Sequence, residues 1–156
     1  MPASFTASYD RITKIVSAIV CLGLGVVIAT VHNLFVACIS AAVVIFGYAF
    51  SPRGYVVAEG AIVVKRLIGN IRVPLKNLRE ARVTTLEDMR GGIRLWGSGG
   101  MFGYYGLFRT SKLGKCTWYV TNRRKMLVVV TDSKTTLYSP DDVEAFLTAV
   151  QASTHS

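Results

Sequence analysis

The amino-acid sequence predicts an α+β protein, mainly β, in which a two-helix transmembrane hairpin precedes a small antiparallel barrel of six to seven strands capped by a C-terminal helix. Three observations predict this fold. Residues 15–50 contain no charged side chain. Residues 55–139 contain short apolar and β-branched runs separated by turn-forming residues. Residues 140–151 begin with Pro and Asp and continue with apolar residues at helical spacing.

The uncharged run is too long for one membrane crossing and has a polar break at its centre. As a single helix it would extend about 54 Å, whereas the hydrocarbon core of a bilayer is roughly 30 Å thick. The polar pair His32-Asn33 divides it. We therefore expect two transmembrane helices, at residues 15–31 and 34–50, folded back on each other as a hairpin.

The breaker cluster Ser51-Pro52-Arg53-Gly54 marks the domain boundary. It divides the chain into residues 1–53, a short tail with the hairpin, and residues 54–156, the second domain.

Charged residues on either side of the hairpin predict its orientation. Arg11 and Lys14 precede the first helix and Arg53 follows the second, whereas the turn at His32 has no Lys or Arg. The positive-inside rule therefore places both termini and the second domain in the cytoplasm. A cleaved signal peptide is the competing interpretation, but a second apolar stretch follows where a cleavage site is expected.

Small residues recur four apart in the first helix, at Ser17, Cys21, Gly25 and Ala29. Such a stripe lets two helix backbones approach closely. It predicts either packing of the two helices within the hairpin or a face on which two copies of the chain form a homo-oligomer.

Seven short runs predict the strands of the second domain: residues 55–58, 61–66, 70–75, 78–85, 115–121, 126–131 and 134–139. Residues 90–108 are rich in Gly and read as a long loop. Ser139 is the expected N-cap of the last helix, with Pro140 in its first turn. Barrel closure would remove open sheet edges and give the helix a core to cover.

The charge of the chain is +9 and is concentrated in the middle of the sequence. A basic domain beside a membrane is attracted to anionic headgroups by about 1 kcal/mol per Lys or Arg near the surface. Nucleic acid is a weaker candidate because a membrane tether disfavours it. The three cysteines form no CxxC pair, and neither His is placed as a general base. We expect no metal, no cofactor and no catalytic site.

Two candidate binding features stand out. The glycine-rich loop carries interleaved aromatic residues, flanked by two cations: Trp96, Phe102, Tyr104 and Tyr105, with Arg94 and Arg109. It is either a structural loop folded back on the domain or a contact for the bilayer interface or a partner. The second feature is a predicted turn with three consecutive cations, Arg123, Arg124 and Lys125, which suits anionic headgroups. Lys65, Arg66, Lys112 and Lys115 add to the same positive field.

Four stretches resemble a bacterial pleckstrin-homology (PH)-like domain family: Gly97–Phe108, Leu113-Gly114, Tyr119–Asn122 and Tyr138–Asp141. The resemblance extends over residues 55–151. It implies a PH-like fold, often preceded by transmembrane helices, with no catalysis attributed to it.

The sequence therefore predicts a non-enzymatic, multi-pass protein of the bacterial inner membrane. It would bind a partner protein or anionic lipid at the cytoplasmic membrane face. The alternative is a self-associating structural membrane module with no lipid specificity.

Overall fold

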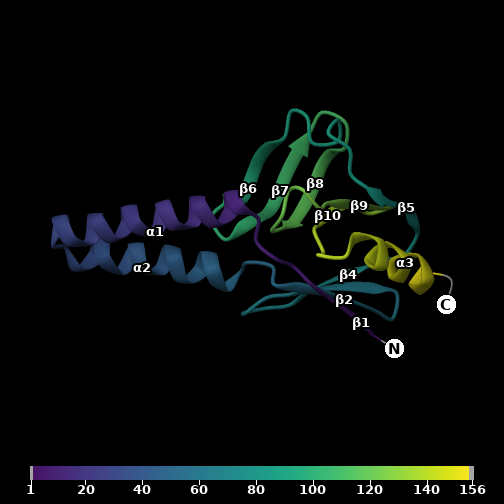
Figure 1. Cartoon of the computed structure of the whole chain (residues 1–156), viewed down its shortest axis with the longest axis horizontal. Helices are drawn as coiled ribbons and strands as arrows, with labels where there is room; N and C mark the ends of the chain where they lie inside the picture. Colours follow the sequence, from purple (N-terminus) through teal and green to yellow (C-terminus); the bar gives the residue numbers. More distant parts are fainter. Residues whose placement is uncertain (1, 155–156) are drawn as a thin grey trace.

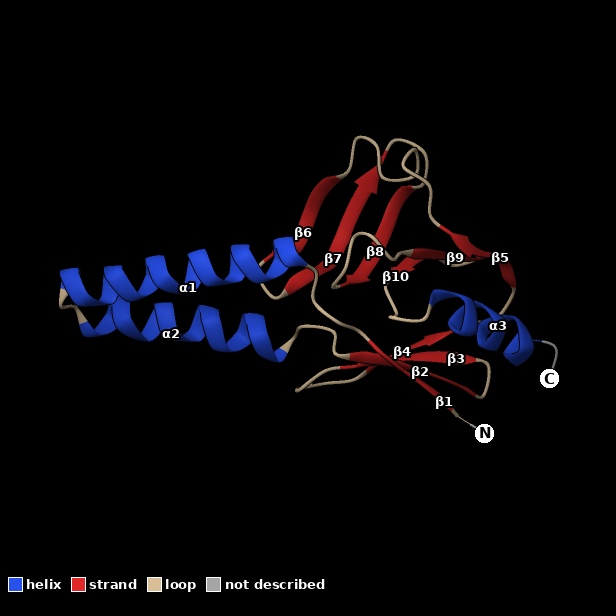
Figure 2. Ribbon diagram, viewed as in Figure 1, coloured by secondary structure: helices blue, strands red, loops and turns tan. Residues whose placement is uncertain are grey.

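The computed structural model describes residues 2–154. Within them lie ten strands and three helices. Two long helices extend to one side of a β-rich body, and the third helix lies at the far end of that body, beside both chain termini (Figure 1). The strands form two separate sheets (Figure 2).

The long helices are α1 (Arg11–Val31) and α2 (Leu34–Ala49). The Asp10 carboxylate accepts a hydrogen bond from the Thr13 amide at 2.7 Å and caps α1. His32 ends α1 in the left-handed region, and the Asn33 side chain caps α2. The helix pair and its break are therefore confirmed. By length and composition α1 is the one described helix able to cross a membrane, whereas α2 is apolar but shorter.

The first sheet is antiparallel and contains β1 (Ala3–Thr6), β2 (Gly54–Ala58), β3 (Ala61–Lys65) and β4 (Ile71–Pro74). Strand β1 is not predicted from the sequence. This strand is four residues long and forms only because β2 offers a free edge, with Phe5 opposite Tyr55. The segment before α1 is therefore part of the β-rich body.

The second sheet has the order β5-β9-β10-β8-β7-β6. Its strands are β5 (Leu78–Val83), β6 (Ile93–Gly100), β7 (Gly103–Thr110), β8 (Gly114–Val120), β9 (Leu127–Thr131) and β10 (Thr135–Tyr138). Strand β10 lies between β9 and β8 and runs parallel to β8, so the sheet is mixed rather than purely antiparallel.

The prediction of a closed barrel of six to seven strands is wrong. After β4 the chain turns at Asn77, whose φ is +56°, and enters the other sheet instead of pairing back along β4. Both sheets remain open. They are joined instead by side chains: the Tyr55 hydroxyl of β2 donates to the Tyr119 carbonyl of β8 and accepts from the Ser139 amide. Burial raises the pKa of Tyr55 to about 12.

Residues 90–108, expected to be a loop, instead contain β6 and most of the β7 strand that follows it as a hairpin. Gly97 and Gly106 face each other across this hairpin. A Cβ on either residue would lie 2.8 Å from the Cα of the other. The glycines that suggested a loop therefore allow two strands to approach closely.

Helix α3 (Val143–Thr154) packs between the two sheets and buries Phe146 and Val150. The prediction that Ser139 caps it is wrong. The Ser139 hydroxyl accepts the Thr121 amide at 2.8 Å instead, and the Asp142 carboxylate accepts the Ala145 amide at the start of the helix. Ser139 is thus engaged in joining β10 to the end of β8.

Candidate functional site

The helix pair is joined to the second sheet at the turn between β6 and β7. The Phe102 amide donates to the Ser17 hydroxyl of α1 at 2.8 Å, and the Phe102 carbonyl accepts from Ser51. The Tyr105 hydroxyl donates to the Gly47 carbonyl of α2 at 2.7 Å. These bonds connect both helices to the β6–β7 hairpin, through Phe102 in its turn and Tyr105 in β7.

The aromatic residues predicted to form one contact surface are divided between several environments. The Phe102 ring packs edge-on against Tyr48 of α2, with ring centroids 5.3 Å apart. Tyr104 is buried in the second sheet's own core, on the opposite face of β7 from Tyr105. Trp96 is 80% exposed. These aromatic residues therefore do not share one surface, and the turn that bears Phe102 contacts the helices.

Arg109 lies apart from this group. It is exposed near the end of β7, beside Lys115 of β8 and Ile93 of β6. The distance along β7 from the helix-contacting end to Arg109 is about 20 Å. The structure therefore separates Arg109 from Phe102 and Tyr105, whereas Trp96, which lies opposite Leu107, is closer to it.

A groove of about 630 Å³ lies where α1 and α2 meet the second sheet. We call it the junction groove. Its apolar wall comes from the helices, and two cations from the domain line it: Val16, Val20, Phe46 and Phe50, with Arg66 and Arg94. Apolar surface and positive charge therefore meet in one groove at the base of the helix pair.

Arg66 is the more enclosed of the two cations. Its guanidinium lies over the rings of Phe50 and Tyr119, at 5.9 and 5.6 Å from their centroids. Its Nε atom is buried and has no hydrogen-bond partner. Burial lowers the pKa of the Arg66 guanidinium from its ordinary value. Among residues 2–154 neither Arg66 nor Arg94 forms an ion pair with a carboxylate.

The basic turn, Arg123 to Lys125, lies at the start of α1. The Arg123 amide donates to Asp10, the N-cap of α1, at 3.2 Å. The Arg123 guanidinium stacks on Tyr104, and the Lys125 ammonium donates to the Asp141 carbonyl. Arg124 is exposed, and only its backbone is bonded, to Asn122. Contacts within the protein therefore position two of the three cationic side chains of the basic turn. The third, Arg124, is free to reach a ligand.

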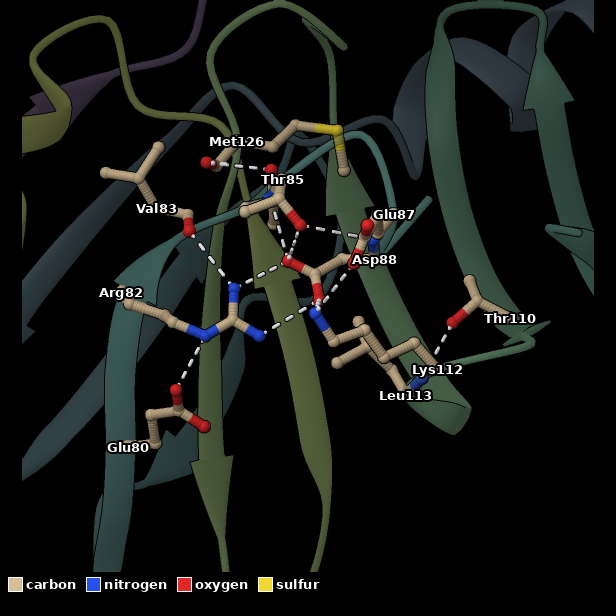
Figure 3. Close-up of polar contacts among 11 residues, drawn as sticks. Glu80, Arg82, Val83, Thr85, Glu87, Asp88, Thr110, Lys112, Leu113 and Met126 are labelled. Carbon is tan, nitrogen blue, oxygen red and sulfur yellow. Dashed lines mark hydrogen bonds and ion pairs between the residues drawn. The ribbon is translucent and has the colours of Figure 1, made fainter. Parts of the chain in front are cut away.

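A third charged cluster is structural. The buried Asp88 carboxylate accepts from both terminal nitrogens of Arg82, at 2.5 and 3.0 Å, and from the Thr85 amide (Figure 3). These hydrogen bonds hold the pKa of Asp88 well below its usual range. Lys112 lies 3.6 Å from both Asp88 and Glu87. Lys112 is therefore committed to this cluster instead of contributing to a field at the helix base.

From the sequence, Arg66 is expected only to add to the positive field. The loop that follows it carries Leu67 and Ile68, which are 58% and 53% exposed. A cation followed by two apolar residues in a predicted turn was the available signal. The groove itself was not predictable, because α1, α2 and β6 come together only in the folded chain.

A family model described as "Bacterial PH domain" matches residues 53–153, well over half of the chain. The match covers both sheets except β1, together with α3, and an apolar N-terminal helix precedes it. Searches of curated proteins and of solved structures found no match.

Proposed function

The chain belongs to the bacterial PH domain family, and from this membership we propose that it is a non-enzymatic binding module anchored to the bacterial inner membrane by its helix pair. The domain faces the cytoplasm in this proposal and binds anionic lipid headgroups through the basic turn. The observation that carries the proposal is the hydrogen bond from Arg123 to Asp10, because it joins the basic turn to the N-terminus of the anchoring helix.

The exposed apolar surface of the helices supports membrane insertion. Leu22 is 71% exposed, Leu34 81% and Ile45 62%. In water each exposed apolar Å² is unfavourable by roughly 25 cal/mol relative to burial. A core helix of a soluble protein would bury these side chains within the domain. A bilayer removes the same surface from water without any partner in the chain.

The length of the free part of the hairpin supports a position of the domain close to the headgroups. Along the helices toward His32, Ser17 and Gly47 are the last described residues that the β6–β7 hairpin hydrogen-bonds. Beyond them, residues 18–31 and 34–46 extend about 20 Å, against roughly 30 Å of hydrocarbon. This is about 10 Å less than the hydrocarbon thickness, so a hairpin that crosses must thin the bilayer locally and draw the base of the domain against the near headgroup layer.

The basic turn is expected to give the protein a preference for anionic lipid. We expect Arg123→Gln, Arg124→Gln and Lys125→Gln together to lower the preference for spin-labelled phosphatidylglycerol over phosphatidylcholine several-fold. One headgroup contact contributes about 1 kcal/mol, and of the three side chains Arg124 is the one not engaged by Tyr104 or Asp141. The measurement is electron paramagnetic resonance of the full chain in bilayers, across a salt series. Screening by salt should reduce the preference in the native chain and have less effect in the variant.

A matched control removes the same charge at the other end of the sheet. Arg90→Gln, Arg109→Gln and Lys115→Gln together should leave the lipid preference unchanged, because these residues lie at the end of β6, β7 and β8 away from the helices. An equal loss in both triple variants would refute the site. No preference in the native chain at low salt would refute lipid binding and favour a self-associating module.

Self-association remains the second candidate because part of the small-residue stripe is open. Ser17 packs against the domain turn, whereas Gly25 and Ala29 are exposed, and a Cβ at Gly25 would meet nothing within 4 Å. The outer half of α1 therefore leaves room for a second helix. If two copies of the chain associate through this face of α1, the protein would be a self-associating membrane module with no lipid specificity.

The proposed orientation of the helix pair can be tested by labelling single cysteines. In a chain whose native cysteines are replaced by Ala, His32→Cys should react with a membrane-impermeant maleimide in intact cells, because the turn lies outside. Arg124→Cys should react only after lysis, since the basic turn lies in the cytoplasm. The reverse labelling pattern would invert the topology, and labelling of neither site before lysis would mean that the hairpin does not cross.

A further inference from the structure

We propose that the junction groove holds one anionic phospholipid molecule, with its phosphate between Arg66 and Arg94 and its acyl chains along α1 and α2. This site is distinct from the basic turn, and it rests on the proposed insertion of the helix pair into a membrane. The basic turn would attract many headgroups weakly, whereas the groove would hold a single lipid.

The groove contains a cation, Arg66, whose charge has no carboxylate partner among the described residues. Arg66 is half-buried, its Nε lacks an acceptor, and no carboxylate of the described chain pairs with it. A buried donor of a charged group that is left unpaired is unfavourable, because it has lost its water without gaining an acceptor. A phosphate oxygen supplies an acceptor and an opposite charge at once, and guanidinium groups bind phosphate through paired N–H donors.

The groove also has an apolar wall. The groove that contains Arg66 is also lined by Val16 and Val20 of α1, Phe46 of α2 and Phe50, which follows α2. A small inorganic anion would neutralise the cation and leave this wall uncovered. An acyl chain covers it, and the helices direct such a chain along their own axes, away from the domain (Figure 1). The combination selects a ligand with one anionic end and one apolar end.

The groove is at the base of the helix pair. It lies where both helices leave the domain, and the proposed insertion of the short hairpin, with local thinning of the bilayer, brings this region against the near headgroup layer. Trp96 lines it and is 80% exposed, as expected for an indole at a membrane interface. The exposed Leu67 and Ile68 follow Arg66 directly. At about 630 Å³ the groove accommodates the headgroup and glycerol region, with the chains extending beyond it.

The test uses Trp96 as the reporter. The chain has two tryptophans, Trp96 and Trp118. In the full chain with Trp118→Phe, purified in detergent, phosphatidylglycerol with brominated acyl chains should quench Trp96 fluorescence saturably. Brominated phosphatidylcholine should quench much less. Arg66→Gln with Arg94→Gln should raise the phosphatidylglycerol concentration for half-maximal quenching by about tenfold or more.

The controls separate this site from the basic turn and from a simple anion site. The triple Gln variant of the basic turn should leave Trp96 quenching unchanged, so a failure of the headgroup proposal does not remove the groove. Arg66→Lys keeps the charge and should fall between the native chain and Arg66→Gln, with an unchanged near-ultraviolet circular dichroism spectrum. Equal quenching by both lipids, or full competition by glycerol phosphate without acyl chains, would overturn the proposal.

Discussion

Replacing Gly97 or Gly106 with Ala is expected to lower the free energy of unfolding by about 3 kcal/mol for each single variant. The two residues face each other across the β6–β7 hairpin, with φ of +108° and +126°. A Cβ on Gly97 would lie too close to the Tyr105 carbonyl, and one on Gly106 too close to the Trp96 carbonyl. Both obstacles are backbone atoms, so no side chain can move aside.

The measurement is chemical unfolding of the full chain in detergent, followed by circular dichroism. Gly114→Ala is the matched control, because Gly114 also has a positive φ, of +65°, but a Cβ there would meet nothing within 4 Å. The control reports the backbone strain alone, and we expect about 1 kcal/mol. If Gly97→Ala lost no more stability than Gly114→Ala, the close approach of the two strands would be contradicted.

The same variants are expected to loosen the helix pair. The turn after β6 carries Phe102, and β7 carries Tyr105, and these two residues provide the hydrogen bonds to Ser17 and Gly47. A distorted β6–β7 hairpin would therefore release α1 and α2 from the domain and open the junction groove. Faster proteolysis between the helices and the domain would report this release.

Replacing Asp88 with Ala is also expected to have a large effect: the free energy of unfolding should fall by about 2 kcal/mol at neutral pH. Asp88 is fully buried, and its carboxylate binds Arg82 and Thr85 (Figure 3). Without it, the Arg82 guanidinium keeps only Glu80 as an ion-pair partner. The loop between β5 and β6 would lose its principal attachment.

The effect of Asp88 should depend on pH in one direction. Arg82 holds the folded pKa of Asp88 well below its usual range, whereas in the unfolded chain the carboxyl titrates near about 3.9. The carboxylate therefore stabilises the fold fully above about pH 5, and this contribution declines as the pH falls through the folded pKa. Unfolding curves of the native chain and Asp88→Asn should converge at acid pH.

Asp132→Asn is the control for that experiment. Asp132 forms its ion pair with Arg79 at the surface, where solvent screens the charges. We expect no clear change in stability from this substitution. A difference between Asp88→Asn and the native chain that persisted undiminished into acid would contradict a role for the carboxylate charge.

The helix pair illustrates what local sequence can predict. Its apolar run and the His32-Asn33 break are contiguous in the chain, and the structure has the helices on either side of that break. The start of α1 was placed a few residues late. The reason is that the prediction began the helix with the uncharged run, whereas Asp10 caps a helix whose first turn contains the charged Arg11 and Lys14.

The glycine-rich segment illustrates where local sequence misleads. Gly97 and Gly106 carry the same local signal in a loop as in a hairpin, because glycine permits both. Only the register between β6 and β7 distinguishes the two. The same limit applies to β1, whose four residues have no pattern of their own and become a strand by pairing with β2.

The sequence by itself determined the helix pair, the C-terminal helix, most strands and the family, because periodicity, turn residues and motifs act over short distances along the chain. Tertiary structure alone decided that the sheets stay open and that Arg109 lies away from the helices. It also decided that Arg66 and Phe50 share one groove. Pairing and burial between distant segments govern these features, and no local pattern encodes them.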